Sequence, residues 1–201
     1  MTHNFQVVFD EITHTYTLGC EKLPSVTQIT KPLSVAHYAG IPEEILAIAA
    51  ERGTAVHEAI ENWLKFDYDD CPDEYRGYFS AFRDWQELVQ PKILYSELRT
   101  HHSVLHYAGT IDLVAEIKGE IFVVDYKTTS QLSDKLCRVQ LEAYRQMLKN
   151  GDLYDIKNKK IGKFALHLKP DGSYSQHDYP ACDVEALKIF TACKSIFDYT
   201  K

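Results

Sequence analysis

The sequence predicts an α/β fold in which a central mixed β-sheet is flanked by helices and an N-terminal β-hairpin forms an appendage. Two observations carry this prediction. Short apolar stretches bounded by Gly, Pro and Asp alternate with longer stretches in which apolar residues recur at helical spacing. Their order is helices, three strands, a helix, two strands and a helix, which is typical of a sheet covered by helices. The length of 201 residues fits a single domain.

The N-terminal region predicts a hairpin followed by helices. Phe5–Phe9 and Thr15–Leu18 are short apolar stretches on either side of a polar turn, which is the pattern of two paired strands. From Glu43 to Lys65 the apolar residues follow helical spacing. Gly53 interrupts this stretch, so we expect a helix break there, with Thr54 capping the next helix.

The rest of the chain alternates between the two patterns. The segment 73–90 has a stripe of aromatic residues at helical spacing, which makes it the clearest amphipathic helix. The expected elements are a helix at 73–90, strands at 93–100, 109–117 and 120–127, a helix at 134–150, strands at 161–168 and 174–179, and a helix at 183–199.

Composition and charge exclude several classes of protein. With 45% hydrophobic and 25% charged residues, the chain has the usage of a globular protein, and it lacks an apolar run long enough for a membrane span. Met1–Phe5 has no signal-peptide character, so we expect a cytoplasmic protein without membrane attachment. The net charge of -7 argues against a general nucleic-acid coat protein, although ten basic and four acidic residues between Lys127 and Lys169 give a local charge of +6.

The five cysteines are scattered and form no C-x-x-C pair. A zinc ribbon or an iron–sulfur cluster therefore has no support in the sequence. We expect free thiols and no iron–sulfur cofactor.

The strands expected at 109–117 and 120–127 contain the main candidate functional residues. If Lys118 and Gly119 form a two-residue hairpin turn, Asp112 lies opposite Asp125, and Lys127 shares their face of the sheet. Two carboxylates about 5 Å apart repel each other by about 3 kcal/mol at an effective dielectric constant of about 20. A proton or a cation must offset this repulsion, and hard oxygen ligands favour Mg²⁺ or Mn²⁺.

Asp112 followed by Asp125-Tyr126-Lys127 resembles the split acidic motif of the PD-(D/E)XK nuclease superfamily. That resemblance implies a restriction-endonuclease-like core. Three further motifs resemble the RecB-type branch, which includes phage recombination exonucleases. They are a G-x-x-D form of the first acid at 109–112, a helical histidine in the stretch 52–57, and a Q-x-x-x-Y helix beginning at Gln140.

The resemblance implies a metal site and a division of roles around it. His57, Asp112, Asp125 and the backbone carbonyl of Tyr126 would hold Mg²⁺ or Mn²⁺, which lowers the pKa of water and neutralises charge on the attacked phosphate. Lys127 would orient or help to deprotonate that water.

Further residues of the predicted site lie on the helix that follows. Gln140 and Tyr144 would position the catalytic lysine or the DNA backbone, and Arg138 and Arg145 are candidate DNA-binding residues. Glu58 and Glu97 are weaker candidates for a second metal, and we leave both outside the predicted site.

The predicted function is a divalent-metal-dependent DNA exonuclease of phage or prophage type that acts in recombination or repair. The whole chain would be one nuclease domain, with an N-terminal hairpin extension at 1–30, a catalytic core at 43–150 and a C-terminal hairpin and helix at 151–201. DNA is the expected partner. A homo-oligomer and a single-strand annealing or recombination protein are further candidate partners.

Two alternatives stay open at this point. The first is a non-catalytic DNA-binding or assembly subunit on the same fold, which the net charge of -7 favours and the complete set of acids and lysine opposes. The second is a zinc hydrolase that uses His101, His102 and His106, although their spacing does not match the helical H-E-x-x-H pattern.

Overall fold

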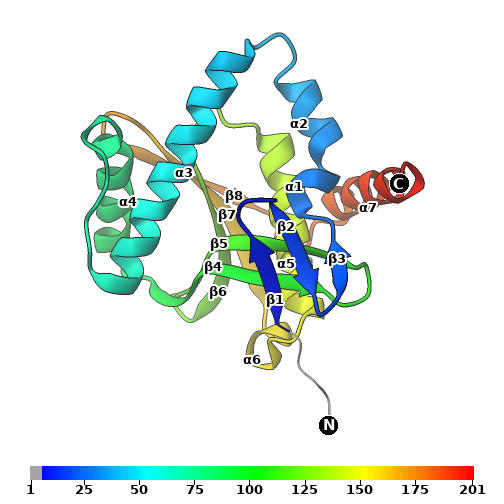
Figure 1. Ribbon diagram of the computed structural model, residues 1–201. Helices are drawn as coiled ribbons and strands as arrows, with labels where there is room; N and C mark the ends of the chain where they lie inside the picture. Colours follow the sequence, from blue (N-terminus) through cyan, green and yellow to red (C-terminus); the bar gives the residue numbers. More distant parts are fainter. Residues whose placement is uncertain (1–5) are drawn as a thin grey trace.

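The main body of the molecule is built on a five-stranded mixed sheet (Figure 1). The computed structural model describes residues 6–201, so Phe5 of the predicted hairpin lies outside the described residues. The strand order is β4-β5-β6-β7-β8, and every neighbouring pair is antiparallel except β6 and β7. The strands are β4 (Lys92–His102), β5 (Tyr107–Ile117), β6 (Glu120–Lys127), β7 (Ile161–Leu168) and β8 (Tyr174–Tyr179).

Helices cover both faces of this sheet, so the predicted α/β fold is confirmed (Figure 1). One apolar core joins the sheet to α5 (Asp134–Asn150) and α7 (Val184–Tyr199). A second core joins the opposite face to α3 (Glu43–Phe66) and α4 (Arg76–Val89), where Phe79, Phe82 and Trp85 are buried. The shorter helices are α1 (Val26–Ile29), α2 (Lys31–His37), the 3₁₀ turn η1 (Asp73–Tyr75) and α6 (Tyr154–Lys157).

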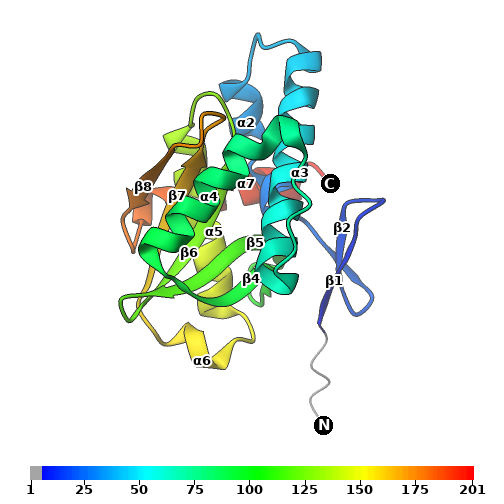
Figure 2. The same cartoon turned by 90° about the vertical axis from the view of Figure 1, so that its left-hand side faces the viewer.

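The predicted N-terminal hairpin is confirmed over the described residues and gains a third strand. β1 (Val7–Asp10), β2 (Thr15–Leu18) and β3 (Glu21–Leu23) form an antiparallel sheet beside α3 (Figure 2). The Tyr16 hydroxyl and the Thr110 hydroxyl lie 2.8 Å apart, which ties this small sheet to β5. The small sheet is therefore attached to the main body next to the strand that carries Asp112.

The predicted break at Gly53 is wrong, because α3 runs without interruption from Glu43 to Phe66. The Thr54 hydroxyl does not cap a new helix and donates instead to the Ala50 carbonyl one turn earlier, at 3.1 Å. A glycine inside a helix costs about 1 kcal/mol relative to alanine, a cost that a long, packed helix tolerates. His57 is consequently carried by one continuous 24-residue helix.

The hairpin of β5 and β6 has the predicted register. Lys118 and Gly119 both have positive φ, 51° and 83°, as a two-residue type I′ turn requires. Five residue pairs follow, from Ile117 with Glu120 to Leu113 with Val124. The pairing then stops, one pair short of the two aspartates.

Beyond that point β5 and β6 no longer pair with each other; apart from an isolated bridge between Ala108 of β5 and Ser25, each strand pairs with its outer neighbour. β5 stays paired with β4 as far as Tyr107, and β6 stays paired with β7 as far as Lys127. The two central strands thus form a fork, and the predicted chemical residues lie at its opening. None of the helices in the described part of the chain is both long and apolar enough to cross a bilayer.

Candidate metal centre

Asp112 and Asp125 are the first residues past the last ladder pair of the fork. The backbone N–H of Tyr126 donates to Oδ2 of Asp112 at 2.7 Å, so a side-chain oxygen replaces the missing backbone acceptor. Both carboxylates are buried, with 9% of Asp112 and 3% of Asp125 exposed. The sheet therefore holds two acids where it opens.

Three side chains from three elements converge at this opening. Nδ1 of His57 on α3 lies 3.6 Å from Oδ1 of Asp112 and 3.8 Å from Oε1 of Glu97 on β4. Among residues 6–201, these three residues each offer one ligand atom, and all three atoms lie within 4.8 Å of one another. An imidazole nitrogen and two carboxylate oxygens at this spacing suit a divalent cation.

Glu97 was left outside the predicted site, and the structure places it inside. It lies between the register pairs Ser96–Leu113 and Leu98–Ile111, which puts it across from Asp112. Its φ of 50° is unusual for a glutamate within a strand. Such strained residues cluster at functional sites. The sequence offers Glu97 only as a weaker candidate, because nothing in the local sequence marks this backbone conformation, and the fold is what brings it to Asp112 and His57.

Lys127 and Asp125 form an ion pair beside this group. The lysine Nζ lies 2.5 Å from Oδ2 of Asp125, but that buried oxygen receives no well-directed hydrogen bond. Asp125 is not one of the group of three, but its carboxylate lies beside them and has an oxygen without a hydrogen-bond partner.

The electrostatics of the site reflect crowded acids in a buried place. Burial and the nearby carboxylates of Asp125 and Glu97 raise the pKa of Asp112, against the influence of His57. Burial lowers the pKa of His57, but Asp112 and Glu97 outweigh it and raise the pKa to about 9. Burial likewise lowers the pKa of Lys127, and Asp125 reverses the effect, so the net shift is upward. The lysine is thus an ammonium at neutral pH.

Two cavities meet at the metal centre, and His57, Lys127, Gly53 and Thr27 line both of them. The larger, of about 860 Å³, extends between α3 and the N-terminal sheet and includes Glu97. The smaller, of about 300 Å³, extends between α2, α3 and α5 and is rich in hydroxyl groups. His57 and Lys127 therefore have open space on two sides.

Gln140 and Tyr144 both lie on the buried face of α5. Gln140 lines the smaller cavity together with Lys127. Tyr144 packs against Gly109, because a Cβ atom at that glycine would come within 3.1 Å of the tyrosine ring. Burial raises the pKa of the Tyr144 hydroxyl well above its ordinary value.

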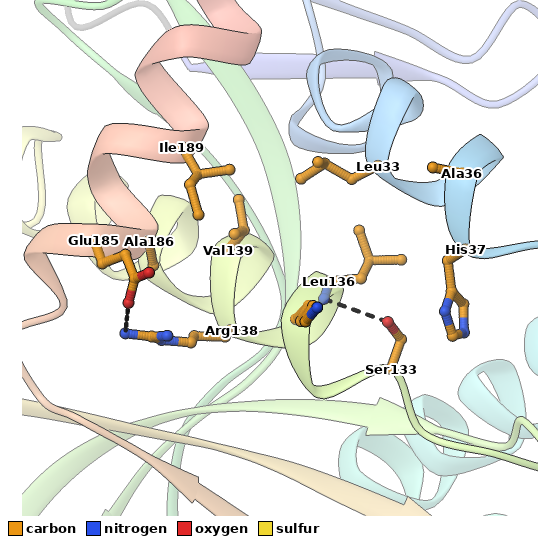
Figure 3. Close-up of a pocket in the computed structure, with 11 residues that line it drawn as sticks. Leu33, Ala36, His37, Ser133, Leu136, Arg138, Val139, Glu185, Ala186 and Ile189 are labelled. Carbon is orange, nitrogen blue, oxygen red and sulfur yellow. Dashed lines mark hydrogen bonds and ion pairs between the residues drawn. The ribbon is translucent and has the colours of Figure 1, made fainter.

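The structure does not bring the two candidate arginines to this centre. Arg138 pairs with Asp183 and Glu185 at the start of α7, and it borders a separate cavity of about 570 Å³ between α2, α5 and α7 (Figure 3). Arg145 is buried and donates to Glu142 at 2.9 Å. Both guanidinium groups are engaged by carboxylates within the fold.

The three histidines of the zinc alternative do not gather. His101 and His102 are buried, whereas His106 is exposed and faces Glu21 at 3.2 Å. Nδ1 of His102 accepts backbone N–H groups of the following turn, at 3.1 and 3.2 Å, so it is occupied by local structure. The group with metal-ligand spacing in the described residues contains none of the three.

The donor set at the fork fits a hard divalent cation. It combines one imidazole with carboxylates whose mutual repulsion a cation would relieve, and an ammonium lies at its edge. A bound cation would supply Lewis-acid activation of water and charge neutralisation at a phosphate.

The sequence comparison agrees with this geometry. The family model described as "PD-(D/E)XK nuclease superfamily" matches residues 75–195. The chain belongs to this superfamily. Membership indicates the general activity of a nuclease. Nucleases of this superfamily use divalent metals and act on DNA. The matched span contains Glu97, Asp112, Asp125 and Lys127, whereas His57 lies before it.

Structural comparison adds a distant match. The crystal structure of SSO0001 is 15% identical to this chain, covers 84% of each chain and gives a TM-score of 0.31. Comparison with the curated proteins gives no match.

Proposed function

We propose that this member of the superfamily is a Mg²⁺- or Mn²⁺-dependent DNA exonuclease that acts in recombination or repair, of the phage or prophage type. The observation that carries the proposal is the convergence of His57, Glu97 and Asp112 beside the Asp125–Lys127 pair. This combination offers a cation site and an ammonium within reach of one phosphate.

Each residue has a role in the proposed reaction. His57, Glu97, Asp112 and Asp125 hold the cation, together with the backbone carbonyl of Tyr126. Lys127 is an ammonium, so it orients the attacking water and stabilises charge on the phosphate rather than removing a proton. The phosphodiester bond is hydrolysed in line.

Two placements support the RecB-type branch within the superfamily. His57 comes from a helix before the matched span and still reaches Asp112, as the helical histidine of that branch would. Gln140 borders the cavity that contains Lys127. In the proposed enzyme Gln140 and Tyr144 position the lysine or the DNA backbone, and Arg138 and Arg145 support this helix through their ion pairs.

The wider setting follows from the resemblance. The chain would work as one nuclease domain in the cytoplasm, with residues 1–30 as an extension, 43–150 as the catalytic core and 151–201 completing it. It would act on DNA as a homo-oligomer beside a single-strand annealing or recombination protein.

A time course with end-labelled linear DNA and closed circular DNA tests the proposal. With Mg²⁺ or Mn²⁺ the linear DNA should be converted to mononucleotides while the circle survives, and EDTA should stop the reaction. Asp125→Asn should abolish cleavage, and Lys160→Ala, on the exposed surface, should not.

Other outcomes separate the alternatives. Loss of the circular DNA would identify an endonuclease. DNA binding that is insensitive to EDTA, without any cleavage, would favour the non-catalytic subunit and contradict the proposal.

A further inference from the structure

The larger cavity at the metal centre has a wall that lies outside the span matched by the superfamily. Phe9, Glu11 and His14 of the N-terminal sheet line it, and α3 lies across from them. Figure 2 shows β1 and β2 beside α3. The small sheet therefore forms one side of the space that leads to His57 and Lys127.

Aromatic rings dominate this wall. The rings of Phe9 and His14 have centroids 5.9 Å apart, and the ring of Tyr16 lies behind Phe9 at 4.5 Å. The guanidinium of Arg99 lies 5.5 Å from the centre of the Phe9 ring, and it also pairs with Glu11 at 3.1 Å. His14 is exposed, so its ring is available to a ligand.

The wall is held in a fixed position. The carboxylate of Asp10 accepts the N–H groups of Ile12 and Thr13 at 2.9 and 3.0 Å, which closes the turn that carries His14. The contact of Tyr16 with Thr110 anchors the strand behind it. The aromatic surface is thus preformed, so a ligand would not have to order it.

The charge of the same cavity limits what it can bind. Four acids line it, namely Glu11, Glu58, Glu61 and Glu97, against Arg99 and Lys127 as the permanent cations. A nucleic-acid backbone gains little from such a surface away from the metal. Affinity for DNA must therefore come largely from the bases, and stacking on aromatic side chains is the sequence-tolerant way to obtain it.

We propose that Phe9 and His14 form a stacking site for an unpaired DNA base while a phosphate of the same strand occupies the metal centre. Inside a duplex both faces of a base are covered by its neighbours, and the last base pair of a blunt end exposes only one face at the end of a rigid helix, so a strand that reaches both the rings and the metal centre is most easily a DNA end with unpaired bases. This inference rests on the proposed nuclease function and adds the class of end that the enzyme accepts.

The test compares two single-stranded substrates in the presence of Mg²⁺ or Mn²⁺. One is oligothymidylate, and the other has the same length and backbone but abasic residues at its terminal nucleotides. The variants are His14→Asn, which keeps a residue tolerant of the left-handed backbone at φ 48°, and Phe9→Leu, which keeps apolar packing on Tyr16. Ile12→Ala is the matched control, because Ile12 is 94% exposed in the same turn and does not line the cavity.

The wild-type protein should cleave oligothymidylate with a higher kcat/KM than the abasic substrate. Each variant should lower kcat/KM for oligothymidylate by about tenfold and leave the abasic substrate unchanged. Ile12→Ala should change neither. A duplex with blunt ends should be a poorer substrate than one with a single-stranded overhang.

Two results would overturn the inference, and they distinguish failure of the stacking site alone from failure of the nuclease function. If the wild-type preference for oligothymidylate persists in both variants, the stacking site is wrong while the nuclease function stands. If the wild-type protein cleaves neither substrate with either metal, the proposed function fails and the stacking site fails with it. Should Phe9→Leu prove unstable, His14→Asn decides alone, since that side chain is exposed.

Discussion

Lys127 and Lys163 lie on the neighbouring strands β6 and β7, and each pairs with a carboxylate inside the fold, yet their surroundings differ. Lys163 is fully buried against Glu142 of α5. Both oxygens of Glu142 accept further hydrogen bonds, from Arg145 at 2.9 and 3.2 Å and from Gln146 at 2.9 Å. This network is closed, and burial lowers the pKa of Lys163.

The Lys127 pair is open by comparison. About a quarter of the Lys127 side chain is exposed, at 23%, and it faces two cavities. Oδ2 of Asp125 receives no directed hydrogen bond, and His57 and Asp112 crowd the same space. A buried charge network with every oxygen satisfied supports the fold, whereas one with unused oxygens beside a cavity can take a cation and a substrate.

The largest expected effect separates the two lysines by activity. Lys127→Met should lower the rate of DNA cleavage by about 10²- to 10³-fold, because it removes the ammonium that orients the water and stabilises charge on the phosphate. Lys163→Met should cleave DNA at the wild-type rate per folded molecule. The assay is run at low temperature so that the variant stays folded. Equal losses of activity in the two variants would contradict the distinction.

The next effect separates the same lysines by stability. Lys163→Met removes one of the three residues that hold the buried carboxylate of Glu142, while Arg145 and Gln146 remain, and should lower the free energy of unfolding by about 1–3 kcal/mol. Urea denaturation monitored by circular dichroism measures it. Lys160→Met, at an exposed ion pair with Glu120, is the control and should unfold like the wild-type protein. A small effect of Lys163→Met would show that the closed network is not a major support.

The open site should also make the metal-free protein sensitive to pH. The pKa of Asp112 is raised in the fold, so its contribution to stability is present below pH about 4 and is lost as the pH rises. The pKa of His57 is raised from 6.5 to about 9, so its contribution is present below pH 6.5 and is lost as the pH rises through 9. In EDTA the free energy of unfolding should therefore fall between pH 5 and pH 9.

Asp112→Asn sharpens that measurement. The variant should flatten the dependence on pH in EDTA, since it removes one titrating acid and relieves repulsion from Asp125 and Glu97. Lys163→Met should leave the slope unchanged. A wild-type protein that becomes more stable in EDTA from pH 5 to pH 9 would contradict this account of the site.

The smallest expected effect concerns Gly53, which lies inside α3 and lines both cavities. Gly53→Ala should raise the free energy of unfolding by about 0.5–1 kcal/mol, because alanine is the better helix former and its Cβ would lie at an ordinary 3.8 Å from the Thr128 hydroxyl. Thermal denaturation measures this change. A loss of stability would mean that the glycine serves the packing of the helix rather than the open space.

Local sequence rules were sufficient for the central hairpin. Lys118 and Gly119 fix a two-residue turn, and that turn fixes the register that carries Asp112 and Asp125 to the same end of the sheet. What these rules could not give was the end of the ladder, where the Asp112 side chain takes the Tyr126 N–H. That contact depends on how β5 and β6 separate toward their outer neighbours.

Long-range placement explains the remaining differences. Glu97 belongs to the site and itself has a left-handed backbone conformation within β4. Gly53 does not break α3, because the packing of the helix outweighs the local preference of glycine. Part of the basic region at 127–169 is buried, because Lys163 and Arg145 both form ion pairs with Glu142 inside the fold. Charge counted along the chain therefore overstated the basic surface.

The central claim is that the fork between β5 and β6 holds a divalent cation through His57, Glu97 and Asp112. Calorimetric titration of the metal-free protein with Mn²⁺ tests it most directly. We predict one binding event for the wild-type protein, weakened by about tenfold or more in Glu97→Gln. Glu58→Gln, which alters an acid of the same cavity outside the group of three, should bind Mn²⁺ like the wild-type protein. Unchanged Mn²⁺ affinity in Glu97→Gln, or no binding by the wild-type protein, would contradict the account.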